Sequence, residues 1–192
     1  MEYICYIDRE RSDVPFMDIL RADSLAEARD LARIPLTGLR FFTVYGPWGR
    51  PDMAPWLFTE AILSGRPIKV FNNGDMRRDF TYIDDIIEGV VATLDNPPQD
   101  DGELKAGGSH APHRIYNIGN SRSEELTRFI DLIEQACGKL AVRESHPLQP
   151  GDVKETYADM GAISNDLGFS PRTSLAQGVP SFVEWFKSYH MR

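Results

Sequence analysis

The chain has 192 residues, enough to bury one substantial hydrophobic core. Its net charge of −8 excludes a broad nucleic-acid-binding surface, because such a surface needs clustered lysine and arginine. No apolar run approaches the roughly 20 residues of a membrane-spanning helix, and the N-terminus M-E-Y-I-C-Y lacks the basic region of a secretory signal. We therefore expect a cytoplasmic protein that binds neither nucleic acid nor membrane.

The cysteines and histidines do not form a recognisable site. Cys5 and Cys137 lack the spacing of a disulfide framework or a metal site, and we expect them to be buried thiols in a reducing compartment. His110 and His113 could suggest a metal, but no third ligand accompanies them. We predict no metal site.

The chain opens with a pattern typical of a small ββα unit. Residues 2–8 alternate as a strand does, and residues 14–20 can form a second strand. Ser24 and Glu27 form a capping box for a short helix that follows. The simplest interpretation of this unit is a packing appendage without chemistry.

Residues 39–52 read L-R-F-F-T-V-Y-G-P-W-G-R-P-D, and we expect a buried strand that ends in a loop. The first half is apolar and favours β-structure, and glycine and proline then stop the ladder. Ligands bind at the carboxyl ends of strands in open α/β sheets. That end carries a polar cluster, namely Thr43, Tyr45, Trp48, Arg50 and Asp52.

Further elements alternate along the rest of the chain. We predict a helix over residues 55–64, a strand over 67–71, a turn at Asn73-Gly74 and a returning strand over 77–80. Asp84 should cap a helix that runs to Leu94 and buries one apolar face: Ile86, Ile87, Val90, Val91 and Leu94.

After an exposed loop, the C-terminal part repeats the same alternation. We predict a strand over residues 115–118 and a helix opened by a capping box at Ser121 and Glu124. An edge strand over 140–143, a short helix ended by Gly168 and a last helix over 174–189 follow, listed here in chain order. Pro180 lies inside the last helix, where proline costs about 3 kcal/mol.

Three arginines stand in loops or beside strands, at Arg50, Arg77 and Arg78. The guanidinium group can donate two parallel hydrogen bonds to a phosphate or a carboxylate. From spacing alone, surface arginines in ordinary ion pairs with nearby aspartates are the favoured interpretation; the candidate partners are Asp79, Asp84 and Asp85.

Several motifs, in this order and spacing, resemble the extended short-chain dehydrogenase/reductase family. The matching stretches are R-F-F-T-V-Y-G-P-W-G-R-P-D-M (40–53), R-D-F-T-Y-I-D-D (78–85), Y-N-I-G-N (116–120), Q-P-G-D-V (149–153) and L-G-F-S-P-R-T (167–173). Within the family the chain is most similar to NAD-dependent epimerases/dehydratases of the UDP-glucuronate 4-epimerase type. The resemblance extends from about Ile34 to the end, so residues 1–33 form a segment unlike the family.

The resemblance implies the fold class. It is α/β, the C-terminal part of a Rossmann-type nucleotide-sugar epimerase. Residues 34–192 would supply the last sheet strands and a small α/β substrate domain with the nucleotide-sugar-binding region.

The resemblance also implies roles for site residues. Arg78 would contact the diphosphate of a nucleotide sugar, and Arg50 a uronate carboxylate. Thr43 would lie near the substrate, and Asp152 near the nucleoside. Tyr116 lies at a strand edge that closes the pocket, where packing and ligand contact are equally good interpretations.

The chemistry implied is redox-assisted epimerisation at C4 of the sugar, with NAD as hydride carrier and a tyrosine beside a lysine as base. None of the seven tyrosines is followed by lysine four residues later, and no glycine-rich dinucleotide motif follows a strand. We therefore assign no catalytic residue and no NAD-binding residue.

The expectation is a substrate-binding part that is not active alone and takes UDP-glucuronate or UDP-galacturonate. Two alternatives stay open: a UDP-sugar-binding pseudoenzyme or partner subunit of a complete epimerase, and a non-functional gene remnant. A homo-oligomer or a complementing epimerase chain is the expected protein partner.

Overall fold

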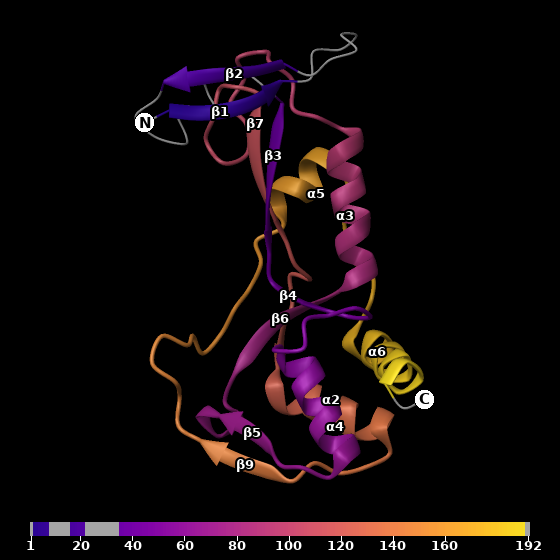
Figure 1. Cartoon of the computed structure of the whole chain (residues 1–192). Helices are drawn as coiled ribbons and strands as arrows, with labels where there is room; N and C mark the ends of the chain where they lie inside the picture. The colour runs from indigo at the N-terminus through magenta and orange to yellow at the C-terminus, as the bar shows by residue number, and fades with distance from the viewer. Residues whose placement is uncertain (1, 8–15, 22–34, 191–192) are drawn as a thin grey trace. The chain divides into compact units, whose positions relative to one another are not determined.

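The computed structural model describes residues 2–7, 16–21 and 35–190 (Figure 1). The chain divides into two compact units, each of two segments. The first holds residues 1–40 and 93–116, and the second holds residues 41–92 and 117–192. The short helix predicted after Ser24 lies outside the described residues.

The first unit contains an antiparallel pair of strands, β1 (Glu2–Ile7) and β2 (Phe16–Arg21), in which Glu2 lies opposite Arg21. The two strands predicted at the start of the chain are thus confirmed. A second pair joins β3 (Leu36–Phe41) to β7 (His113–Ile118).

The prediction of one buried strand that begins at residue 39 is wrong for its first residues. The strand is interrupted at Phe42, so that β3 ends at Phe41 and β4 (Thr43–Tyr45) begins a different sheet. Phe41 is 49% exposed, whereas Tyr45 is 2% exposed. The reason is pairing: among the described strands β3 has β7 as its one neighbour, whereas β4 lies against the core strand β6.

The second unit is organised around β6 (Arg77–Tyr82). β4 runs parallel to β6 on one side, and β8 (Ser123–Glu125) runs antiparallel on the other, with Arg78 opposite Glu124. A separate pair is formed by β5 (Ile68–Phe71) and β9 (Arg143–His146), which run parallel.

The predicted turn at Asn73-Gly74 forms, but the returning strand does not pair with its predecessor. Residues 72–74 make a single 3₁₀ turn in which Asn72, Asn73 and Gly74 have φ of 48°, 52° and 85°. Three consecutive left-handed residues redirect the chain more than a two-residue hairpin turn does. β5 therefore joins β9, while β6 joins the other sheet.

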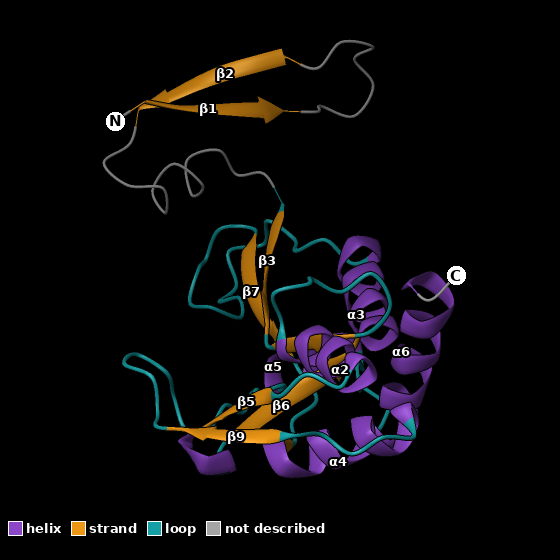
Figure 2. Cartoon of the chain, turned by 60° about the horizontal axis from the view of Figure 1, so that its bottom comes forward, coloured by secondary structure: helices purple, strands orange, loops and turns teal. Residues whose placement is uncertain are grey.

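Three helices pack with the sheet strands of the second unit (Figure 2). They are α2 (Ala54–Ser64), α4 (Leu126–Cys137) and α6 (Leu175–His190). Their apolar faces meet in one core, where the rings of Phe80 and Phe129 stack at 4.2 Å between centroids. The predicted helices over these segments are confirmed, and α6 runs through Pro180.

The capping box predicted at the start of α4 does not form. Glu124 lies in β8, where its backbone pairs with Arg78, and the helix begins one residue later with Glu125 as its N-cap. Ser121 has a φ of 50° and its hydroxyl donates to the carbonyl of Ala158 instead. Strand pairing therefore prevails over the local capping signal. A short helix, α5 (Gly161–Leu167), follows as predicted and ends at Gly168.

The buried face predicted for α3 (Ile83–Asp95) is only partly correct. Ile86 is 4% exposed, but three members of the predicted face stand open to solvent: Ile87, Val91 and Leu94. The inward side instead passes through Gly89, whose backbone closely approaches Ile118 and Phe169. Two apolar stripes run along this helix, and periodicity alone did not tell which one packs inward. None of the helices in the described ranges is long and apolar enough to cross a bilayer.

Close packing of α6 on β4 leads to a stability prediction. A Cβ at Gly178 would lie 2.2 Å from the hydroxyl of Tyr45, whose ring contacts Phe80, Tyr82 and Phe129. Gly178→Ala should therefore lower the free energy of unfolding by about 1–3 kcal/mol, despite the better helix propensity of alanine. Urea denaturation measures the effect, and Glu184→Ala on the exposed side of α6 is the control.

The same contact allows a rescue test. The Tyr45 hydroxyl has no hydrogen-bond partner among the described residues, so Tyr45→Phe should keep or raise stability. Combined with Gly178→Ala, it should recover part of the loss, because the shortest contact disappears. Strictly additive effects of the two changes would contradict this account of the packing.

Candidate functional site

The second unit contains a cavity of about 510 Å³, within the range of small-molecule sites. Its walls come mainly from α2, β5 and β6, with further residues from β4, α4 and the loops next to these elements. Most of the lining is apolar, contributed by Met53, Ala54, Leu57, Phe58, Ala61, Pro67, Ile68, Phe71, Met76, Phe80 and Leu126. A few polar side chains face the same space, namely Thr43, Asp52, Glu60, Arg66, Lys69, Arg78 and Asp152. An apolar cavity with few polar groups is suited to binding an organic ligand in one orientation.

Arg78 enters the cavity because of the pleat of β6. Successive side chains on a strand point to opposite faces, so Arg78 and Phe80 line the cavity while Asp79 is fully buried on the other side. The guanidinium group of Arg78 donates to Oδ1 of Asp152 at 2.7 Å and to the carbonyl of Lys154 at 3.2 Å. Its side chain is 17% exposed, so this ion pair is more sheltered than a surface pair.

The preceding arginine has a different role. Arg77 forms ion pairs with Glu125 at 2.9 Å and with Glu155 at 3.4 Å. It also donates to the backbone carbonyl of Ser123 and does not line the cavity. Arg77 therefore joins β6 to the neighbouring β8 and to the segment that follows β9.

The three arginines do not pair with the candidate aspartates at positions 79, 84 and 85. The carboxylate of Asp79 accepts backbone amides, and so does that of Asp85, which accepts those of Arg172 and Thr173. Asp84 lies in the first turn of α3 rather than at its N-cap. Buried carboxylates next to backbone donors satisfy those donors. Arg77 and Arg78 pair with carboxylates that are more distant in sequence.

Arg50 lies on the loop between β4 and α2 and pairs with Asp52. Two hydrogen bonds join them, from Nε to Oδ1 at 3.0 Å and from Nη2 to Oδ2 at 2.5 Å. The hydrogen bond from Arg50 lowers the pKa of the Asp52 carboxyl group. Asp52 lines the cavity, whereas Arg50 is exposed and lies outside the lining, so this edge presents a neutralised carboxylate.

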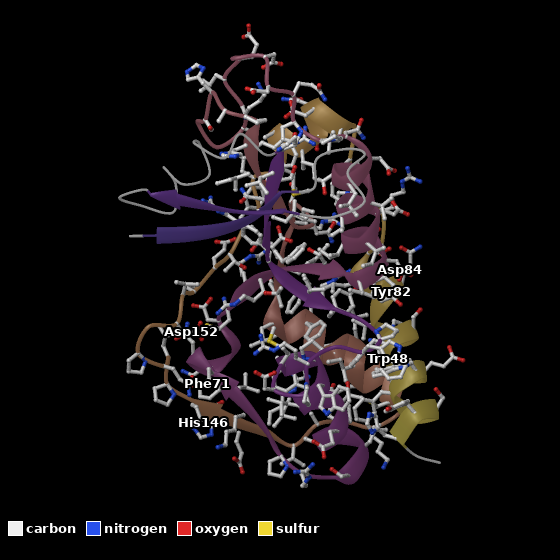
Figure 3. The ribbon with its side chains drawn as sticks, turned by 45° about the horizontal axis from the view of Figure 1, so that its top comes forward. Trp48, Phe71, Tyr82, Asp84, His146 and Asp152 are labelled. Atoms are coloured by element: carbon white, nitrogen blue, oxygen red, sulfur yellow. The ribbon has the colours of Figure 1, made fainter. Side chains whose placement is uncertain are left out.

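The loop that carries Arg50 is fixed by aromatic stacking. Trp48 has a φ of 64°, and its ring lies 5.5 Å from that of Trp185 and 4.9 Å from that of Tyr189 on α6. Figure 3 shows Trp48 beside α6. Left-handed backbone costs energy at a non-glycine residue, and these ring contacts offset part of that cost.

The predicted site residues divide into two groups. Thr43, Arg78 and Asp152 line the same cavity, although they are far apart in sequence. Arg50 reaches the cavity edge through Asp52. Tyr116 is 1% exposed in the first unit, beneath the guanidinium of Arg114 at 5.0 Å, and is not part of the lining.

Sequence reasoning missed the part of the lining that follows α2. Phe71 lines the cavity at the carboxyl end of β5, with the His146 ring 5.6 Å away (Figure 3). Lys69 also lines it, and among the described residues no carboxylate pairs with it. The available signal was the position of Phe71 at the carboxyl end of a strand, where ligands bind in α/β sheets, and no such signal marked Lys69. Within the described ranges, no three His, Cys, Asp or Glu side chains cluster as a metal site would require.

Comparisons with known proteins agree with the resemblance seen in the motifs. The model of the NAD dependent epimerase/dehydratase family matches residues 20–119. "Protein CapI" of Staphylococcus aureus is 46% identical over 84% of this chain and 50% of its own length. The "Probable UDP-glucuronate 4-epimerase" of Rhizobium meliloti is 39% identical and covers 100% of this chain, which matches 59% of that protein.

A solved structure supports the same relationship. A UDP-glucuronic acid 4-epimerase variant from Bacillus cereus, in complex with UDP-4-deoxy-4-fluoro-glucuronic acid and NAD, superposes with a TM-score of 0.73 at 33% identity. The match covers 85% of this chain and 48% of that one. The chain thus spans about half the length of the relatives it matches, and the predicted Rossmann-type α/β class is confirmed. The chain belongs to the NAD dependent epimerase/dehydratase family.

Proposed function

We propose that this chain is the substrate-binding part of a nucleotide-sugar epimerase and holds a UDP-sugar in the cavity of its second unit. The observation that carries the proposal is the meeting of Arg78 and Asp152 at the wall of an otherwise apolar cavity of about 510 Å³. A relative at 33% identity was crystallised with a UDP-uronic acid derivative. Residues 34–192 would carry this role, and the boundary near Arg33 stays a prediction.

In this proposal the guanidinium group of Arg78 donates hydrogen bonds to the diphosphate of the ligand. Arginine binds phosphate well because its planar donors match two oxygens at once. The diphosphate would compete with Asp152 for these donors, which would release the aspartate to accept hydrogen bonds from hydroxyl groups of the nucleoside. Lys69 adds a further positive charge to the lining, and Phe71 offers an aromatic face to the base.

The sugar end of the ligand would lie toward Thr43 and the Arg50–Asp52 pair. A uronate carboxylate carries the charge that Arg50 can accept, and it would have to replace Asp52 as the partner of that guanidinium. Thr43 lines the cavity and can donate a hydroxyl hydrogen bond to the ligand. UDP-glucuronate and UDP-galacturonate both meet these requirements.

We propose no catalytic step for these 192 residues alone. The sequence has neither a Tyr-x-x-x-Lys nor the glycine-rich dinucleotide motif. The described helix that follows parallel strand β6 does not fit a dinucleotide either, because its first turn holds Asp84 and Asp85. A pyrophosphate at that helix N-terminus would meet like charge. Bound NAD would supply hydride transfer in the family, but the residues present give it no site.

A second candidate role is a partner subunit that pairs with a polypeptide carrying the rest of an epimerase. The observation that favours it is the open apolar stripe on α3, where Ile87 is 51% exposed and Val91 is 46% exposed. The chain also matches only about half of its relatives. The unmatched half of an epimerase, supplied by another chain, is the partner we propose for this stripe.

Substitution of Arg78 tests the proposed diphosphate contact. Arg78→Ala should weaken binding of UDP-glucuronate at least tenfold in calorimetric titration, because charge-assisted hydrogen bonds contribute about 1.5–3 kcal/mol. Arg77→Ala is the matched control, since it removes the adjacent arginine from outside the cavity. Equal affinity of wild type and Arg78→Ala, or an equal loss in both variants, would contradict the proposed diphosphate contact.

The next prediction concerns the sugar end. Arg50→Ala should weaken UDP-glucuronate binding several-fold and leave UDP-glucose binding within about twofold, because only the uronate carries a carboxylate. The ratio of the two dissociation constants, measured on the same protein, is the readout. An equal effect on both ligands would remove Arg50 from uronate recognition.

The partner role makes a separate prediction. A Val91→Asp substitution should abolish co-purification with a separately expressed N-terminal half of a related epimerase, because it places charge in the apolar stripe. Glu88→Ala on the same helix is the control and should not. Failure of the wild-type chain to bind that half, or binding by Val91→Asp, would refute this role. A wild-type chain that self-associates through the stripe would assign it to a homo-oligomer instead.

A further inference from the structure

Asp79 is a fully buried carboxylate between two residues of the cavity wall, Arg78 and Phe80. The pleat of β6 turns its side chain away from the cavity. A buried carboxylate has to be matched by hydrogen-bond donors. The donors of Asp79 come from two segments that are distant in sequence.

Each oxygen of Asp79 accepts a backbone amide. Oδ1 accepts the amide of Asn120 at 2.6 Å, and Oδ2 accepts the amide of Ala158 at 3.0 Å. The hydroxyl of Thr81 adds a longer hydrogen bond to Oδ1 at 3.4 Å. One side chain therefore ties β6 to the turn after β7 and to the segment that follows β9.

The approach of these segments is close. A Cβ at Gly119 would lie 2.3 Å from that of Ala158 and 3.1 Å from both oxygens of Asp79. The amide of Asp79 also donates to Oγ1 of Thr156 at 3.1 Å. The close packing and the hydrogen bonds together hold the backbone of residues 156–158 in a defined position against β6.

That position determines where Asp152 stands. Residues 147–155, which include Asp152, are exposed to solvent. They connect the end of β9 to residues 156–158, which are hydrogen-bonded to Asp79. Along β6 the segment is joined by Arg77, whose amide donates to the carbonyl of Lys154 at 2.8 Å. The anchor at Ala158 adds to these backbone contacts and fixes the far end of the segment in which Asp152 pairs with Arg78.

We propose that Asp79 is a positioning residue for the ligand site: its carboxylate anchors residues 156–158 and thereby holds Asp152 against Arg78 at the cavity. The inference rests on the proposed binding of a UDP-sugar in this cavity. It adds a residue that touches no ligand and acts through the segment that carries Asp152.

The test compares two buried carboxylates with the same chemistry. Asp85 is 3% exposed and accepts the amides of Arg172 and Thr173, but it does not line the cavity or hold a segment that does. Asp79→Asn and Asp85→Asn each replace one carboxylate oxygen by an NH2 group, which donates and cannot accept a backbone N–H, so one of the two backbone amides loses its acceptor. Both should lower the unfolding midpoint, so stability alone does not separate them.

Two readouts do separate them. Calorimetric titration with UDP should show at least a tenfold weaker affinity for Asp79→Asn and a change within twofold for Asp85→Asn. Amide hydrogen exchange without ligand should rise in peptides covering residues 147–160 for Asp79→Asn, and near residues 170–178 for Asp85→Asn.

If Asp79→Asn does not fold, Gly119→Ala is the second variant for the same test. It displaces Ala158 by contact and keeps the carboxylate, so it should give the same exchange pattern and the same loss of UDP affinity. UDP affinity within twofold of wild type in a folded Asp79→Asn or Gly119→Ala protein would overturn the proposal, and so would an equal loss in Asp85→Asn. If wild type does not bind UDP, the proposed function fails; unchanged exchange over 147–160 in Asp79→Asn would then refute the anchor independently.

Discussion

The alternation of side chains along β6 is the constraint on which the described site depends. One face of this strand presents Arg78 and Phe80 to the cavity, and the other buries Asp79. A shift of register by one residue would exchange the two faces and place a carboxylate in the cavity wall. The register is held by β4 on one side and β8 on the other, and by the aromatic packing of Phe80 on Phe129 below. Binding chemistry and core packing are therefore set by the same strand.

The second unit has a core of its own, but some of its apolar side chains outside this core are exposed to solvent. α2, α4 and α6 enclose one cluster of fully buried aromatic and aliphatic side chains. On α3, by contrast, Ile87, Val91 and Leu94 are exposed, and so is Phe41 on β3. Apolar surface of this kind marks contact sites for other polypeptides. This contrast is found in a chain that matches about half the length of its relatives.

Sequence patterns predicted the elements with strong local signals, and motif resemblance predicted which residues would meet. The helix predicted to end at Gly168 does so, and α2 and α4 also end at glycines, Gly65 and Gly138, because a left-handed cap is a local property. The capping box at Ser121 failed because strand pairing of Glu124 is decided by β6, far away in sequence. The exposed stripe of α3 could not be told from its buried one, since both have helical spacing. Phe71 and Lys69 were missed because nothing local marks a strand end as a cavity wall.

The most direct test of the account is calorimetric titration of the purified chain with UDP-glucuronate and, separately, with NAD. The proposed function predicts measurable binding of the sugar nucleotide, because the second unit contains the cavity lined by Arg78 and Asp152. It predicts no binding of NAD, because the sequence lacks the glycine-rich motif expected of a dinucleotide site. A well-folded chain that binds neither ligand would contradict the substrate-binding role and favour a non-functional remnant. Tight binding of NAD would contradict the assignment of residues 1–33 as a segment unlike the family.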